Sequence, residues 1–93
     1  MEPQREERRR SVRTAREGPV TLRAAMPAVR IIHAQLMDES IEGFRVSHQD
    51  RWLESGVVVE FEAAGRHGSA RVMWTRRQHG INESGLYILP KAE

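Results

Sequence analysis

The stretch that decides the fold is residues 57–74, which read VVVEFEAAGRHGSARVMW. It starts with a β-branched run at 57–61, passes through glycines at 65–68 that are typical of a turn, and continues into a second apolar run at 69–74. Side chains in the second run alternate between two faces, with Ala70, Val72 and Trp74 against Arg71 and Met73. This period of two predicts neighbouring β-strands.

The same kind of pattern recurs on both sides of this stretch. Short apolar or alternating runs at 20–24, 29–37, 44–46 and 85–89 bring the number of expected strands to six. Turn residues lie between them, at 38–43 and 52–56, and Pro90 ends the last run. Clean helical periodicity is absent throughout. The sequence therefore predicts an all-β fold, either a small antiparallel barrel or a sandwich.

The first nineteen residues differ in composition from the rest. They read MEPQREERRRSVRTAREGP, in which Val12 is the one large apolar side chain after Met1. Such a segment buries too little surface to order itself. We therefore expect a single domain over 1–93, with a flexible arginine-rich arm at 1–19, ended by Gly18-Pro19, and a barrel at 20–90.

Composition restricts the function classes. The chain has 93 residues, a net charge of +2 and no cysteine, which excludes disulfides, thiolate zinc sites and cysteine catalysis. Arginine supplies all but one of the 15 basic residues. No apolar run approaches the roughly 20 residues of a membrane span, and the N-terminus is charged rather than apolar, so a cytoplasmic location is expected.

Arginines cluster in the arm at Arg8, Arg9, Arg10 and Arg13. A guanidinium group binds phosphate, or the O6 and N7 edge of guanine, with two hydrogen bonds. Several of them on a flexible segment can converge on one polyanion. The alternative is a solvated charge run that only keeps the protein soluble.

Residues 38–43 read DESIEG and follow an expected strand. Asp38 and Ser40 place a carboxylate and a hydroxyl on one turn, and Gly43 permits positive φ or the close approach of a ligand. A carboxylate here could accept both N1–H and N2–H of a guanine. In the alternative, Asp38 and Ser40 bond their own backbone in an Asx-turn, and Gly43 closes a hairpin.

Other chemistry has little support. The four histidines are not at metal-ligand spacing, and the sequence offers no nucleophile–base arrangement and no Gly-rich phosphate loop before a helix. We therefore expect no enzyme activity, no metal and no cofactor. Trp74 is expected at the end of a strand, where it could border a site.

Two motifs, by their order and their separation along the chain, resemble those of the PilZ domain family. They are RxxxR at Arg9–Arg13 and, about 25 residues later, D-x-S-x-x-G at Asp38–Gly43. The runs at 70–74 and 85–88 resemble later strands of the family, so the resemblance extends from about Arg8 to Leu89. Glu39 stands where the family is usually apolar, and the chain stops soon after the last strand, without the C-terminal helix of many members.

The resemblance implies a six-stranded antiparallel barrel that binds cyclic di-GMP and acts as a receptor. Arg9 and Arg13 would be the principal ligand arginines, with Arg8 and Arg10 as helpers. Asp38 would accept from guanine, supported by Ser40, while Gly43 would allow close packing and Trp74 would lie at the rim. The arm would order on binding and signal to a downstream protein partner, from a monomer or a ligand-dependent dimer.

Two further interpretations stay open. One is a single-stranded nucleic-acid binder on a small barrel, with the arm following the phosphates. Only five aromatic residues and one basic arm make a nucleic-acid polymer the weaker choice of ligand. The other is a PilZ-like interaction module that works without a ligand. Both motifs are complete, which argues against this second interpretation.

Overall fold

The computed structural model describes residues 14–91, and the regular secondary structure in this part of the chain is entirely β-strand. Six strands follow one another: β1 (Thr14–Ala24), β2 (Arg30–Glu39), β3 (Gly43–His48), β4 (Val58–Ala63), β5 (Arg66–Gln78) and β6 (Ile81–Ile88). The all-β prediction is confirmed.

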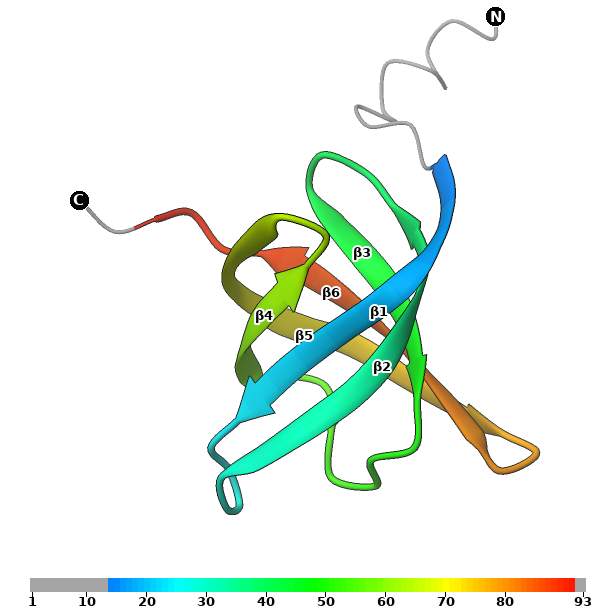
Figure 1. Cartoon of the computed structure of the whole chain (residues 1–93). Coiled ribbons are helices and arrows are strands. Elements are labelled where there is room, and N and C mark those ends of the chain that lie inside the picture. Colours follow the sequence, from blue (N-terminus) through cyan, green and yellow to red (C-terminus); the bar gives the residue numbers. More distant parts are fainter. Residues whose placement is uncertain (1–13, 92–93) are drawn as a thin grey trace, which may run out of the picture.

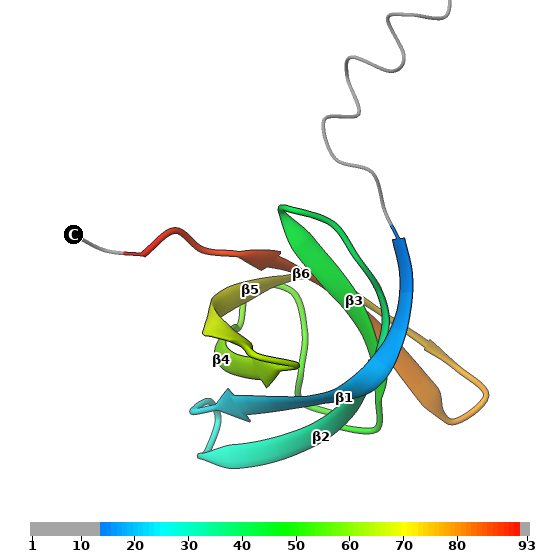
Figure 2. The same cartoon turned by 45° about the horizontal axis from the view of Figure 1, so that its top comes forward.

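The strands close into one antiparallel barrel in the order β1-β2-β3-β6-β5-β4, with β4 pairing back onto β1 (Figure 1). In the turned view of Figure 2 the strands surround a common interior. Because the sheet closes on itself, every strand pairs with a neighbour on both sides over at least part of its length. This confirms the six-stranded barrel and excludes the sandwich.

The interior is filled by side chains that alternate along the strands, and a last one comes from the loop between β3 and β4. The buried apolar residues are Val20, Leu22, Ala24, Ile32, Ala34, Leu36, Phe44, Val46, Leu53, Val59, Phe61, Ala70, Val72 and Leu86. Burying each of the larger ones stabilises the fold by about 1.5–3 kcal/mol. The core therefore comes from all six strands and from loop residue Leu53.

Two tight turns fix the register of β5 with both of its neighbours. Ala64-Gly65 joins β4 to β5 with φ values of 33° and 84°, and His79-Gly80 joins β5 to β6 with φ values of 51° and 80°. Positive φ at both central residues is typical of the two-residue hairpin whose twist matches that of the strands. The turn expected at 65–68 thus lies slightly earlier, and β5 already begins at Arg66.

β1 begins at Thr14, so residues 14–19, which were expected in the arm, lie in a strand. Only Thr21–Ala24 pair with β4, whereas the earlier residues of β1 pair with β2 alone. Residues 14–19 of β1, which have β2 as their one neighbouring strand, are largely exposed, whereas Val20 is buried in the core. Pro19, which has no N–H, is tolerated where β1 has no β4 partner.

The expected alternation Ala70, Val72, Trp74 is also wrong at its last member. The pairing of β5 with β6 shifts between Val72 and Trp74, so that Met73 is an extra residue in β5. A bulge of this kind rotates the following side chains to the other face. Val72 is fully buried, but Trp74 lies outside the barrel, within β5 rather than at its end. The last strand likewise begins at Ile81, before the run expected at 85–89.

Candidate functional site

The D-x-S-x-x-G segment forms the hairpin between β2 and β3. Asp38 and Glu39 end β2, and Gly43 begins β3. The Ser40 backbone N–H donates to the Gly43 carbonyl oxygen at 2.8 Å, and the Ser40 hydroxyl lies 3.5 Å from the same oxygen. Ser40 therefore closes its own turn, as the alternative interpretation expected of it.

Asp38 lies on the outer face of the barrel, opposite Ala15 of β1 and Arg45 of β3. Its carboxylate accepts from the Arg45 guanidinium at 2.8 Å. The Asp38 side chain is 11% exposed and that of Arg45 is 34% exposed, so the arginine is the more accessible member of the pair. Arg45 was not among the residues singled out from the sequence.

Gly43 is required by the neighbouring strand. A Cβ atom at this position would overlap the carbonyl oxygen of Leu86 on β6. The hairpin end thus packs closely against β6, and this backbone contact explains the glycine without a ligand. The φ of Gly43 is not positive, unlike that of four other glycines.

Trp74 lies on the outer face of β5, in the same row of paired residues as the hairpin residue Asp38. Along one row across the strands, Arg45 lies opposite Gly85 of β6, and Gly85 lies opposite Trp74. The indole covers Gly85 so closely that a Cβ there would overlap the ring. Asp38, Arg45 and Trp74 consequently belong to one continuous row on the outside of β2, β3, β6 and β5.

Charged side chains connect the two ends of this row. Glu83 accepts from Arg76 at 2.9 Å and lies 4.0 Å from Arg45. The Arg76 guanidinium lies 5.5 Å from the centre of the Trp74 ring, a distance typical of a cation–π contact. The buried Nε of Arg45 has no hydrogen-bond partner within the described residues. We call Asp38, Arg45, Trp74, Arg76 and Glu83 the outer row.

The four predicted ligand arginines Arg8, Arg9, Arg10 and Arg13 lie outside the described residues. The structure shows where the chain enters the barrel. Thr14 is paired with Glu39, and Ala15 with Asp38. The arginine-rich sequence is therefore followed directly by a β1 residue, Thr14, that pairs with Glu39 beside the β2–β3 hairpin.

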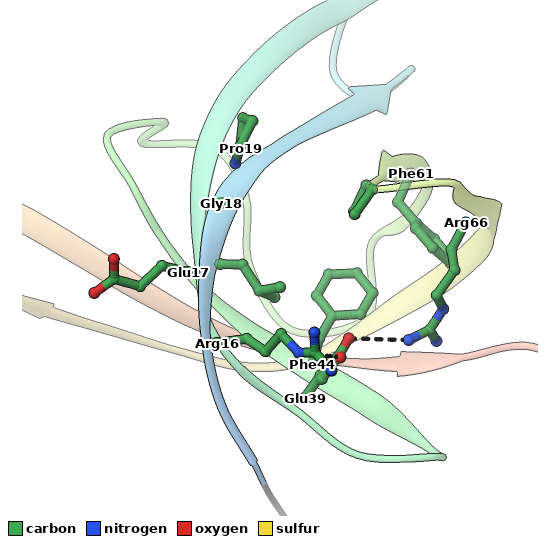
Figure 3. A pocket seen from close by; sticks show the side chains of 11 residues that line it. Arg16, Glu17, Gly18, Pro19, Glu39, Phe44, Phe61 and Arg66 are labelled. Carbon is green, nitrogen blue, oxygen red and sulfur yellow. Dashed lines mark hydrogen bonds and ion pairs between the residues drawn. The ribbon is translucent and has the colours of Figure 1, made fainter.

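A pocket of about 350 Å³ opens beside the same hairpin, where β1 and β4 no longer pair. We call it the rim pocket. Its apolar walls include Leu36, Phe44 and Phe61, and at its rim Glu39 accepts from Arg16 at 2.9 Å and from Arg66 at 3.0 Å. Figure 3 shows these three charged side chains converging near the Phe44 ring, while Glu17 points away. No motif in the sequence indicates this cluster, because its members come from three strands.

The opposite end of the barrel holds a buried polar chain. His48 Nδ1 accepts from the Asp50 backbone N–H at 3.1 Å, which leaves Nε2–H to donate to Ser84 Oγ at 2.8 Å. Ser84 Oγ lies 2.7 Å from Thr75 Oγ1, which donates to the Leu53 carbonyl oxygen at 3.1 Å. Ser84 is fully buried, so this serine–histidine pair is structural.

The pKa values at this end follow from its packing. Burial lowers the pKa of His48, opposed by the charge of Asp50 and assisted by that of Arg77. Burial alone would raise the pKa of Asp50, but hydrogen bonds from Arg30 and from the Trp52 N–H, together with the charges of Arg30 and His48, lower it below its usual range. The folded state therefore favours a neutral histidine and an ionised aspartate.

Among residues 14–91, no three metal-ligating side chains come together, and no helix has the length and apolarity to cross a bilayer. No known protein-family model and no curated protein matches this chain. The function must therefore be argued from the hairpin, the outer row and the charge around them.

Proposed function

We propose that this protein is a cyclic di-GMP receptor, not an enzyme, and that the ligand binds outside the barrel at the β2–β3 hairpin. The observation that carries the proposal is the β1–β2 register, which places Thr14 opposite Glu39 and Ala15 opposite Asp38. Consecutive Cα atoms are about 3.8 Å apart, so the hairpin is within reach of Arg13. That the sequence carrying the RxxxR motif enters the barrel beside the D-x-S-x-x-G hairpin supports the proposal.

The ligand has two phosphodiester charges and two flat purines. In this proposal Arg9 and Arg13 bind phosphates and guanine faces, and Arg8 and Arg10 assist. Arginine suits both roles, because its guanidinium forms paired hydrogen bonds with anions and stacks on rings. Asp38 accepts from a guanine edge, supported by Ser40 and by the close packing at Gly43.

The outer row extends this ligand set. Arg45 is ion-paired with Asp38 and exposes part of its guanidinium, so we add it as a contact for a phosphate or for guanine. Trp74 offers an exposed ring on the same row, held by Gly85 beneath it and by Arg76 beside it. A purine stacked there would gain about 1–3 kcal/mol.

The energetics are consistent with a signalling receptor. Micromolar binding corresponds to about 8 kcal/mol. A few charge-assisted hydrogen bonds of about 1.5–3 kcal/mol each, reduced by the cost of ordering the arm, reach this range. In this proposal the ligand orders the arginine-rich arm in the cytoplasm, and a downstream protein partner recognises the ordered form.

Isothermal titration calorimetry of the whole chain tests the proposal. Cyclic di-GMP is titrated first, then cyclic di-AMP as the matched adenine ligand, and then a single-stranded oligonucleotide. We expect saturable heat with cyclic di-GMP and binding at least about tenfold weaker with cyclic di-AMP, since adenine lacks the N1–H and N2–H donors.

The other outcomes distinguish the alternatives. Binding of the oligonucleotide with no heat from cyclic di-GMP would identify a single-stranded nucleic-acid binder. An absence of heat from all three would leave the interaction module that works without a ligand. Either result overturns the receptor proposal.

A further inference from the structure

We propose that the rim pocket is a separate binding site for a small amphiphilic carboxylate, an acid with an unbranched apolar chain of about eight carbons. This inference does not depend on cyclic di-GMP. The outer row faces away from the barrel, whereas the rim pocket opens into the end of the barrel between β1 and the β4–β5 turn.

The interior of the pocket suits an apolar chain. Leu36, Phe44 and Phe61 are core residues that also line it, and the two aromatic rings lie 5.0 Å apart in a tilted pair. The volume of about 350 Å³ falls in the range of small-molecule sites. At about 30 Å³ for each water-sized group, it accommodates roughly twelve such groups, and therefore a short acyl chain and its head group.

The rim of the pocket suits one negative charge. Arg16 and Arg66 share the single carboxylate of Glu39, so this cluster of three side chains has a formal charge of +1. Glu17 also lines the pocket, but its side chain points away from the cluster (Figure 3). Arg16 donates through Nε and Arg66 through Nη1, and within residues 14–91 their other N–H groups make no further ion pair or hydrogen bond. Each guanidinium has five N–H donors, so both retain donors for a second carboxylate.

Glu39 is a positioning residue in this arrangement. It is the least exposed of the three charged side chains, at 21%, and it holds two half-exposed arginines at the rim. A carboxylate ligand would bind beside Glu39 with its head between the arginines and its chain against Phe44 and Phe61. A ligand that contacts both the charged rim and the apolar interior must be an amphiphile. A purely polar ion would contact the rim alone, and a neutral apolar chain would contact the interior alone.

The experiment is an NMR titration of the whole chain with octanoate, compared with octanamide and acetate. Octanamide keeps the chain and lacks the charge, whereas acetate keeps the charge and lacks the chain. We expect octanoate to shift the amide signals of Glu39, Phe44 and Arg66 in a saturable way, and each control compound to bind at least about tenfold more weakly. No shift at millimolar octanoate, or equal affinity for octanamide, overturns the proposal.

Two variants locate the site. Arg66→Gln removes a rim charge, and Arg71→Gln removes an exposed arginine from the same strand, opposite Tyr87 and away from the pocket. We expect Arg66→Gln to weaken octanoate binding about tenfold and Arg71→Gln to leave it unchanged. Equal losses in the two variants would show a general charge effect and contradict a site at the rim.

Discussion

The two ends of the barrel use polar residues in opposite ways. At the loop end, His48, Ser84 and Thr75 are joined in one buried chain of hydrogen bonds that ends on the Leu53 carbonyl. At the hairpin end, arginine and glutamate side chains meet in partly exposed ion pairs around Asp38 and Glu39. Buried polar groups that satisfy one another stabilise a fold, whereas exposed ion pairs contribute little stability. This contrast is consistent with placing the proposed ligand site at the hairpin end.

The largest effect is expected from His48→Ala at the loop end. The substitution removes one of the two hydrogen-bond partners of the Ser84 hydroxyl, leaves the Asp50 N–H without its histidine acceptor, and opens a cavity. We expect a loss of about 3 kcal/mol in the free energy of unfolding, with little change in cyclic di-GMP affinity. Urea denaturation and calorimetry measure the two quantities.

The matched control is His33→Ala, an exposed histidine on β2. Its effect on the free energy of unfolding should stay within about 0.5 kcal/mol. If the two variants lost equal stability, or if His48→Ala abolished binding while the protein stayed folded, the contrast between the ends would fail.

The next largest effect is expected from Arg13→Ala. Losing this arginine should weaken cyclic di-GMP binding at least about tenfold, or about 1.4 kcal/mol, with the melting temperature nearly unchanged. Arg23→Ala, an exposed arginine on β1 that faces Glu60, is the control and should bind normally. A large drop in melting temperature for Arg13→Ala would instead make this arginine structural.

A change in selectivity is expected from Asp38→Ala. Removing the carboxylate deletes the acceptor for guanine and also breaks the ion pair with Arg45. Affinity for cyclic di-GMP should fall severalfold, about 1 kcal/mol, and the preference over cyclic di-AMP should narrow. Competition titrations with the two dinucleotides measure this. An unchanged preference would argue against the guanine-edge role.

The smallest effect is expected from pH. The folded-state pKa of His48 lies below its unfolded value of 6.5, so the unfolded chain binds more protons. The contribution of His48 to the free energy of unfolding is therefore complete above about pH 6.5 and is lost as the pH falls. The pKa of Asp50 is lowered from 3.8, so protonation of its carboxylate causes a further loss in the free energy of unfolding below that pH. Urea denaturation between pH 7.5 and 5.5 should show this decline in wild type and less of it in His48→Phe, a variant that cannot titrate. Equal declines would place the titrating group elsewhere.

Much of the fold follows from the order of residues alone. Alternation at 20–24 and 57–61 predicts barrel strands, because each buried side chain there faces the same interior. The start of β1 could not be predicted, since residues 14–19 pair on one side only and carry no apolar pattern. The bulge at Met73 was missed for a similar reason, because an inserted residue leaves no mark in composition.

The residues of the candidate site likewise fall into those that the sequence predicts and those that it does not. Asp38, Ser40 and Gly43 come together because they are neighbours in sequence, so a local motif finds them. Arg45 and Glu83 join them only through strand register, which spacing along the chain does not reveal, whereas Trp74 was expected near the site from the family resemblance. The rim pocket is harder still to foresee, because it arises where β1 and β4 separate.

The most direct test of the central claim is a ¹H–¹⁵N NMR titration of the whole chain with cyclic di-GMP. We expect the amide signals of residues 38–43 and the indole N–H signal of Trp74 to move as the ligand saturates, while the amide signals of His48 and Asp50 stay in place. Unmoved hairpin and indole signals in excess ligand, or shifts concentrated around His48, would contradict it.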